Sequence, residues 1–533
     1  MAYVITQNCC KDASCIPVCP VDCIRPAGAA GEHTTTEMLY IDPETCIDCG
    51  ACMEECPVDA IFFEDDLTEE LSSFREINAA YFRAHPLQPE TVAEPSRHSP
   101  VPGGSLRVAI VGAGPAACYA ALELLAVDGV EVDLFERLPT PFGLIRAGVA
   151  PDHQNTKSVT KTFERAFTNT RFGCHLNVEV GTTLTHEDLL AHHHAVIYAV
   201  GASDSRPLGI PGQDLPGSHA AADFVGWYNG HPDHAGHEFD LSGQQAVIVG
   251  NGNVALDVAR VLLMPDHDLR QTDIAEHALE ALSHSNIREV VILARRGPRA
   301  AAFSAGEFLA LGHLDGVDVV IEGADLSAQP DDDVETEIKL DIARAYAHRT
   351  QTPGNKRIVF RFWSTPDEVL GDDTVTALRV RNGDGQTEDI AASLLLRSIG
   401  YRGTPMAGVQ FDDAAGRIPN DRGRVLAADG QPAAGVYVTG WIKRGPRGVI
   451  GTNRTCAEET VGHLLDDFDA GLLTRNVEDR TALRGLLADR GLAPVDWSGW
   501  RGIDSAERDR GREASRPRVK FVRIDDMLAA ADS

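Results

Sequence analysis

The stretch Cys46-Ile-Asp-Cys49-Gly-Ala-Cys52-Met-Glu-Glu-Cys56-Pro-Val-Asp-Ala-Ile61 sets three cysteines at every third position and a fourth directly before a proline. Its second half repeats Cys15-Ile-Pro-Val-Cys19-Pro-Val-Asp-Cys23-Ile24, which lies 37 residues upstream. Nine of the 12 cysteines fall within the first 56 residues. Crowded thiolates in a chain without a secretion signal indicate metal ligands rather than disulfides. The repeat therefore predicts a small module that holds two metal clusters.

The spacing of the second copy resembles that of bacterial two-cluster ferredoxins, in which three thiolates hold one cluster and the fourth reaches the other. The same duplication, with Cys-Pro in both copies, argues against zinc or inert core cysteines. If the cysteine that precedes the proline in each copy binds the cluster of the other copy, one [4Fe-4S] cluster is held by Cys19, Cys46, Cys49 and Cys52.

The other site has fewer ligands. The vicinal pair Cys9 and Cys10 stands where two spaced cysteines are expected, so the chain positions supply three thiolates and predict a [3Fe-4S] cluster, as in seven-iron ferredoxins. Its ligands are Cys9, Cys15 and Cys56. Cys10 remains an alternative to Cys9, and a second [4Fe-4S] cluster that uses both remains open. Cys23 is expected to be a buried free thiol.

Two further segments separate this module from the rest of the chain. Apolar residues between Leu71 and Phe82 recur at helical spacing, which predicts an amphipathic helix closing the module. Residues 85–104 contain five prolines and predict an extended, semi-rigid linker. We therefore place a ferredoxin domain at 1–66 and the helix with its linker at 67–105.

A dinucleotide pattern begins at residue 107, where the apolar run Arg-Val-Ala-Ile-Val leads into Gly112-Ala-Gly114-Pro-Ala-Ala117. A helical pattern follows, and the next apolar strand ends in Glu136. Glycines at these positions let the backbone approach a pyrophosphate at the helix N-terminus, and the acid can bind a ribose hydroxyl. Residues 106–136 therefore predict a Rossmann-like site for FAD or NAD.

The pattern recurs at Gly250-Asn251-Gly252-Asn253-Val254-Ala255, again between an apolar strand and a helical segment. Here the second strand ends at Arg295 and Arg296 instead of an acid. Guanidinium groups pair well with phosphate, so the two arginines favour a 2′-phosphate and thus NADP(H). A chain with two unlike dinucleotide sites and iron–sulfur clusters suggests a flavin between them, because flavin accepts hydride and releases electrons singly.

Composition limits the partners. The chain has 533 residues with a formal net charge of −31, and 15 acids face two bases in residues 1–70. This charge opposes nucleic acid and anionic membranes. The leading segment MAYVITQNCC has no basic n-region, and no long apolar run occurs, so we expect no signal peptide, no membrane span and a cytoplasmic location.

The segment Pro141-Phe-Gly-Leu-Ile-Arg-Ala-Gly-Val-Ala-Pro-Asp-His153-Gln resembles the adrenodoxin-reductase-like ferredoxin–NADP reductases. So do AVIYAVGA at 195–202, GNGNVALDVAR at 250–260, RRGP at 295–298 and GWIKRGPRGVIGTN at 440–453. Together with the N-terminal module, the chain resembles the actinobacterial type in which a ferredoxin is fused ahead of such a reductase. The expected fold is multidomain, α+β and α/β: a two-cluster ferredoxin followed by two Rossmann-like domains.

This resemblance implies the cofactor contacts and the remaining domains. FAD is expected along Gly112, Gly114, Ala116, Glu136, Leu144, Val180, Trp441, Gly448, Val449 and Ile450. NADP is expected at Asn251, Gly252, Asn253, Val254, Arg295, Arg296 and Glu307. The implied domains are FAD-binding at 106–202 and 401–474, NADP-binding at 203–400, and a C-terminal extension at 475–533 whose charges we expect to be mainly solvated.

The resemblance also implies catalytic roles for His153, Glu307 and Trp441. The family pairs a histidine with an acid on the helix after RRGP; that helix carries Glu307 here, and Ala310 stands one turn later. The expected activity is NADPH-dependent reduction of FAD, then of the clusters, and then of an external ferredoxin or cytochrome P450-type acceptor. Two alternatives are an electron-input subunit resembling the small subunit of glutamate synthase, and a non-catalytic iron–sulfur relay or sensor.

Overall fold

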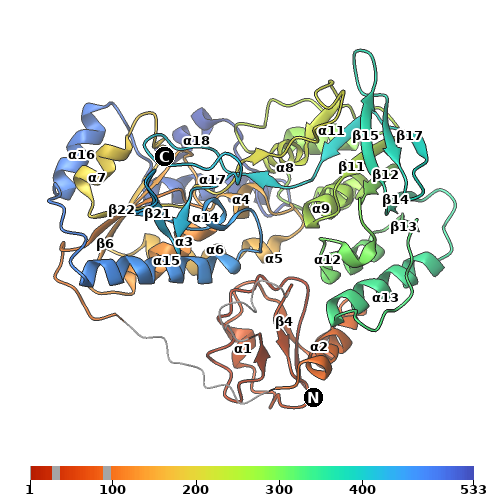
Figure 1. The fold of residues 1–533 in the computed structure, drawn as a ribbon, viewed down its shortest axis with the longest axis horizontal. Coiled ribbons are helices and arrows are strands. Elements are labelled where there is room, and N and C mark those ends of the chain that lie inside the picture. Colours follow the sequence, from red (N-terminus) through yellow and green to blue (C-terminus); the bar gives the residue numbers. More distant parts are fainter. Residues whose placement is uncertain (1, 27–36, 88–97, 533) are drawn as a thin grey trace.

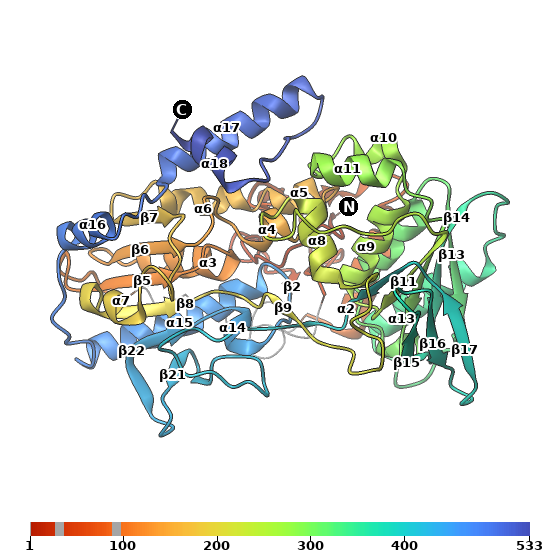
Figure 2. The ribbon, with the colours of Figure 1, turned by 90° about the horizontal axis from the view of Figure 1, so that it is seen from above.

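The structure is a computed structural model that describes residues 2–26, 37–87 and 98–532. Part of the predicted linker, residues 88–97, lies outside the described residues. The predicted fold class is confirmed: a small N-terminal module lies against two α/β units, each built on its own sheet (Figures 1 and 2).

The N-terminal module contains two small antiparallel sheets. β1 (Tyr3–Ile5) pairs with β4 (Ile61–Phe63), and β2 (Ile24–Arg25) pairs with β3 (Tyr40–Ile41). The short α1 (Ala51–Glu54) precedes β4, and α2 (Ser73–Ala84) closes the module. The buried Asn78 of α2 accepts hydrogen bonds from the backbone N–H groups of Ile41 (2.9 Å) and Ile5 (3.3 Å), so one side chain joins both sheets.

The first α/β unit contains a seven-stranded sheet in the order β20-β21-β22-β8-β5-β6-β7. Its parallel strands are β5 (Arg107–Val111), β6 (Glu131–Glu136), β7 (Phe172–Leu176), β8 (Ala195–Tyr198) and β22 (Pro432–Val438), and β21 (Arg424–Leu426) and β20 (Asn420–Asp421) add an antiparallel edge. Helix α3 (Pro115–Leu125) packs on the long α15 (Thr452–Asp469). Near these lie α4 (Leu144–Ala147), α5 (Gln154–Lys157), α6 (Thr160–Phe167), α7 (His186–His192) and α14 (Trp441–Arg444).

The second α/β unit contains a six-stranded parallel sheet in the order β10-β18-β11-β12-β14-β13. The strands are β10 (Ser218–Ala220), β11 (Gln245–Val249), β12 (Glu289–Leu293), β13 (Val317–Glu322), β14 (Lys356–Arg361) and β18 (Leu394–Arg397). The helices are α8 (Ala221–Asn229), α9 (Asn253–Leu263), α10 (Asp266–Leu269), α11 (Glu276–Ser283), α12 (Ala305–Ala310) and α13 (Val334–His348). A separate antiparallel sheet of β15 (Thr365–Leu370), β16 (Ala377–Arg381) and β17 (Thr387–Ala391) packs beside them.

The chain passes between the two units twice, and the two crossings pair. β9 (Asp204–Ser205) and β19 (Tyr401–Arg402) form a short antiparallel ribbon (β9 is labelled in Figure 2). We propose this ribbon as the border between the units, beside the divisions expected at residues 203 and 401.

The C-terminal extension forms α16 (Arg480–Asp489), α17 (Trp497–Glu513) and α18 (Ile524–Ala531). Most of its charged side chains are exposed, as expected, but Glu507, Arg516 and Lys520 are buried. Glu507 is fully buried, and its carboxylate accepts hydrogen bonds from Arg146 (2.9 Å) and Arg518 (3.1 Å). Burial opposes this charge, but the two arginines outweigh it and lower the pKa of Glu507. The buried ammonium of Lys520 lies 3.1 Å from Asp273 of the second unit. These charges pair because the extension packs across both units.

None of the helices in the described parts of the chain has the length and apolar character needed to span a membrane.

Candidate functional site

A single cavity of about 1480 Å³ extends through both α/β units. Both glycine turns line it, as do residues 7–11 of the N-terminal module. In parallel α/β sheets, ligands bind at the carboxyl ends of the strands, where these turns lie. The cavity therefore connects the two predicted dinucleotide sites with the cysteine-rich module.

The first turn follows β5 and fits a dinucleotide. Gly112 has φ +101°, and a Cβ there would lie 2.6 Å from the carbonyl oxygen of Ala199. Gly114 has nothing within 4 Å of such a position, so its backbone is open to a phosphate. The Glu136 carboxylate accepts the backbone N–H groups of Ala113 (2.9 Å) and Leu138 (3.1 Å) at the cavity wall.

The wall beyond this turn exposes apolar side chains, which fits a flat ring system. Leu144 is 43% exposed and Val449 is 37% exposed, although both line the cavity. Exposed apolar groups at a concave site are typical of surfaces that a ligand covers. The other residues expected for FAD also line it: Ala116, Val180, Trp441, Gly448 and Ile450.

The second turn follows β11 and has the same design. Gly250 has φ +116°, and a Cβ there would lie 2.1 Å from the carbonyl oxygen of Ser398, whereas Gly252 is open. The side chains of Arg295 and Arg296, after β12, are exposed where they line the cavity. An exposed guanidinium pair at this edge suits a 2′-phosphate. Asn251, Asn253, Val254 and Glu307 line the same part.

Between the two turns lies a buried charge network that the sequence patterns did not indicate. Arg260 of α9 is 3% exposed and pairs with Asp152 (2.7 Å), Asp257 (2.7 Å) and Glu307 (3.1 Å). Burial opposes its charge, but these carboxylates outweigh it and raise the pKa of Arg260. The only sequence signal for this network was the terminal arginine of GNGNVALDVAR.

Arg260 also joins the two residues expected to form a catalytic pair. Its Nη2 lies 2.7 Å from Nε2 of His153, and Nε2 of His153 lies 3.8 Å from Oε2 of Glu307. The pairing is thus present without an acid at position 310. Burial, with a contribution from Glu307, raises the pKa of Asp257 to about 6.

One group of cysteines lies together near the surface of the module. Burial, and then the neighbouring thiolates of Cys46, Cys19 and Cys49, raise the pKa of Cys52 to about 12. Cys19, Cys46, Cys49 and Cys52 line one small pocket, so their thiols converge as ligands of one cluster do. Cys23 lies beside them, with its sulfur 3.5 Å from that of Cys19. We call Cys19, Cys46, Cys49 and Cys52 the distal site.

A second group faces the α/β units. Burial, and then Cys9 and Cys56, raise the pKa of Cys15, so these three thiols form a group that we call the proximal site. Cys9 packs against the core of the N-terminal module as well as that of the first α/β unit, whereas Cys10 lies in the core of the first unit alone. Both vicinal residues line the large cavity. The geometry favours Cys9 as the third ligand.

The first unit receives the proximal side of the module through backbone contacts. The N–H of Gly451 donates to the carbonyl oxygen of Cys10 (2.7 Å), and a Cβ on Gly451 would lie 2.0 Å from the carbonyl oxygen of Lys11. Asp12 is buried, and its carboxylate accepts the hydroxyl of Tyr119 (2.7 Å). Nη1 of Arg454 donates to the carbonyl oxygen of Asp12 (2.9 Å).

The second unit contacts the module as well. The backbone N–H of Ala305, at the start of α12, donates to Glu37 (2.6 Å), and Lys339 of α13 pairs with the same carboxylate. Glu335 of α13 accepts the hydroxyl of Tyr40 (3.2 Å). The module therefore bridges both α/β units, beside α5 and α13 in Figure 1. The interpretation of residues 85–104 as a spacer gave no sign of this docking.

Comparison with known proteins agrees with the geometry. A family model described as "Pyridine nucleotide-disulphide oxidoreductase" matches residues 106–297, and one described as "4Fe-4S binding domain" matches residues 39–62. The chain is 48% identical to a "Probable ferredoxin/ferredoxin--NADP reductase" of Mycobacterium bovis, over 100% of this chain and 95% of that protein. A similarly named protein of Mycobacterium leprae is 46% identical, over 100% of this chain and 98% of that protein.

A solved structure, "Mycobacterium tuberculosis FprA in complex with NADPH", matches with a TM-score of 0.76 and 42% identity. The match covers 80% of this chain and 100% of that chain. The resemblance expected from the sequence motifs is confirmed. On these matches, the chain belongs to the fused ferredoxin/ferredoxin–NADP reductase family.

Proposed function

We propose that this chain is an NADPH-dependent ferredoxin reductase that passes electrons through its own N-terminal clusters. The observation that carries the proposal is the single cavity, because it is lined by both glycine turns and also by Cys9 and Cys10. FAD, when bound there, accepts hydride from NADPH and releases electrons one at a time.

The second turn with Arg295 and Arg296 is the proposed NADPH site, and the first turn with Glu136 is the proposed FAD site. Trp441 lines the cavity, with its ring 5.7 Å from that of Tyr401. We assign Trp441 to cover the flavin on its nicotinamide side. His153 and Glu307, joined by Arg260, are the proposed residues that hold a proton and orient the nicotinamide.

We propose the order proximal site, then distal site, for electron flow. The proximal site, with three cysteines, fits a [3Fe-4S] cluster, and the distal site, with four, fits a [4Fe-4S] cluster. Cys9 of the proximal site lines the cavity, whereas Cys49 of the distal site is exposed. The chain thus offers an entry on the flavin side and an exit at the surface.

The exit surface suggests the acceptor. Ile47 (57% exposed) and Met53 (44% exposed) flank Cys49, and the exposed acids Asp48 and Glu54 adjoin them. An apolar centre with an acidic rim suits a redox protein that carries a basic patch. We propose an external ferredoxin or a cytochrome P450-type protein with such a patch as the acceptor, and a cytoplasmic location for the reaction.

An anaerobic titration of the holoprotein tests this function. NADPH should bleach the flavin absorbance and then produce the electron paramagnetic resonance signals of reduced clusters, whereas NADH should act only at much higher concentration. Failure of NADPH to bleach bound flavin would refute the reductase and leave the relay or sensor. Stable co-purification with a larger oxidoreductase would instead favour the input subunit.

The nucleotide preference has its own matched test. R295Q and R296Q should each weaken NADPH by about tenfold or more relative to NADH, since each removes a charged phosphate partner. R288Q is the control, because Arg288 is exposed at the opposite end of β12. Equal losses in all three variants would contradict the assignment of the arginine pair.

A further inference from the structure

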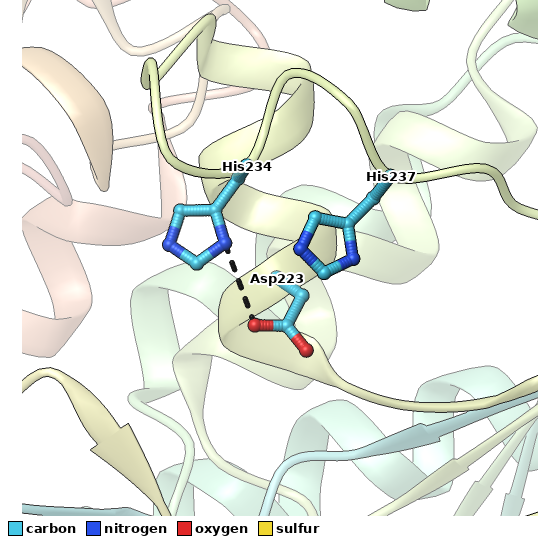
Figure 3. Close-up of side chains that lie close together, drawn as sticks. All are labelled: Asp223, His234 and His237. Atoms are coloured by element: carbon cyan, nitrogen blue, oxygen red, sulfur yellow. Dashed lines mark ion pairs between the residues drawn. The ribbon is translucent and has the colours of Figure 1, made fainter.

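The loop after α8 gathers histidines at every third position: His231, His234 and His237. Two successive turns shape it, since the N–H of His234 donates to the carbonyl oxygen of His231 (3.0 Å) and that of His237 to the carbonyl oxygen of His234 (3.1 Å). Figure 3 shows the rings of His234 and His237 directed toward Asp223, which lies in the first turn of α8.

The separation of these side chains matches ligands of one ion better than a hydrogen bond. One ligand atom from each of Asp223, His234 and His237 lies within 4.8 Å of the others. Nδ1 of His234 lies 3.4 Å from Oδ1 of Asp223. An N–H···O hydrogen bond is shorter, about 2.7–3.2 Å. Two ligands of a tetrahedral zinc ion, each about 2.1 Å from the metal, stand about 3.4 Å apart.

The ring of His234 is also held without a hydrogen bond. Its Nδ1 is buried and has no hydrogen-bond partner in the described parts of the chain. A Cβ on Gly226 would lie 2.4 Å from Cδ2 of His234, so the ring rests directly on the backbone of α8. The ring of His237 stacks on Phe239. Packing therefore presents both rings to the carboxylate in fixed positions.

A comparison within the molecule separates this group from an ordinary ion pair. His153, Asp257 and Glu307 form a second group of three potential ligands, one imidazole and two carboxylates, but the guanidinium of Arg260 lies among them. That group already contains its cation. Among the described residues, no lysine or arginine forms an ion pair with Asp223. Its carboxylate and two imidazoles are therefore without a resident cation.

We propose that Asp223, His234 and His237 bind one divalent transition-metal ion of the zinc type, with the fourth position open to water. Two imidazoles and one carboxylate form a ligand set that such ions favour. The ion would join the loop after α8 to the helix itself. The same loop forms part of the cavity wall through His231 and Pro232, and its Asp233 pairs with Arg137 (2.5 Å), directly after Glu136. This proposal does not rest on the proposed redox function.

Zinc binding to the full-length holoprotein tests this site. Flavin- and cluster-loaded protein would be dialysed anaerobically against micromolar Zn²⁺, and zinc, iron and flavin would be counted per chain. The wild type should hold one zinc that D223N and H237Q bind at least about tenfold more weakly. H267Q is the matched control, because His267 is 70% exposed and its one ion pair with a described residue is with the neighbouring Asp268, at 3.4 Å.

X-ray absorption at the zinc edge gives a second readout that does not depend on the variants folding. The wild type should show nitrogen and oxygen neighbours with the outer-shell pattern of imidazole. Sulfur neighbours would place the zinc on cysteines and overturn the proposal. No bound zinc in the wild type, or equal zinc in wild type, D223N and H237Q, would overturn it as well.

Discussion

The two cysteine sites descend from one repeated sequence, yet they occupy opposite environments. The distal site keeps four cysteines and includes the exposed Cys49. The proximal site has three, and its neighbour Cys10 is buried in the core of the first α/β unit. The distal copy of the motif faces solvent, and the proximal copy faces the first α/β unit, so the two copies pack in different surroundings. The irregular cysteine spacing of the first copy thus occurs where the module docks.

The largest effect is expected from a substitution at the distal site, where electrons are proposed to leave the chain. C49A should abolish reduction of an external protein acceptor, because the distal cluster loses its most exposed ligand, while NADPH should still reduce the flavin. Stopped-flow absorbance and iron content measure both effects. C23A is the control, since we expect Cys23 to be a free thiol; iron loss in C23A equal to that in C49A would show that Cys23 is a ligand.

The second test concerns the proximal site, where electrons from the flavin are proposed to arrive. C9A should lose the proximal cluster and stop transfer from flavin to the distal cluster, because Cys9 groups with Cys15 and Cys56. C10A should keep its iron and lose only packing. Electron paramagnetic resonance of the oxidised protein reads the [3Fe-4S] signal directly. Retention of that signal in C9A together with its loss in C10A would reverse the assignment.

A smaller effect is expected when both clusters stay intact and only their approach to the flavin changes. G451A places a methyl group against the carbonyl oxygen of Lys11, while its helical backbone (φ −66°) tolerates alanine. We expect flavin-to-cluster transfer to slow by up to about 10²-fold, the scale for a misplacement near 1 Å. G462A on the same helix α15 has open space around it and should leave the rate unchanged.

The smallest effect concerns the acidic rim of the distal side. E54K should lower the association rate with a basic acceptor severalfold and weaken its salt dependence, because steering acts on encounter more than on affinity. E280K, on the exposed face of α11, is the matched control. Rates measured across ionic strength distinguish the two; an equal response would remove the rim from the docking surface.

Sequence reasoning was strongest where chemistry fixes spacing. The fold class and the family were predicted because glycine turns, strand ends and Cys-Pro repeats are local patterns. The Arg260 network was missed, because ion pairs between residues such as Asp152 and Arg260 depend on how two units meet. Most charges of the extension are exposed, as expected, but buried exceptions such as Glu507 were missed for the same reason, because the sequence does not show that their partners lie elsewhere in the chain.

Because the module docks on both α/β units, we expect the cluster content of the module and the NADP⁺ affinity of the chain to depend on each other. Glu37 contacts α12 and α13, and Asp12 contacts α3 and α15, so the module contacts both units that carry the proposed nucleotide sites. Small metal-containing modules generally depend on their metal to fold, and we expect the same of this one. By thermodynamic reciprocity, a chain short of iron should bind NADP⁺ less tightly, and bound NADP⁺ should slow cluster loss by the same factor. Calorimetry of iron-replete and iron-depleted protein would measure that factor, which would make this reductase responsive to the iron status of its cell.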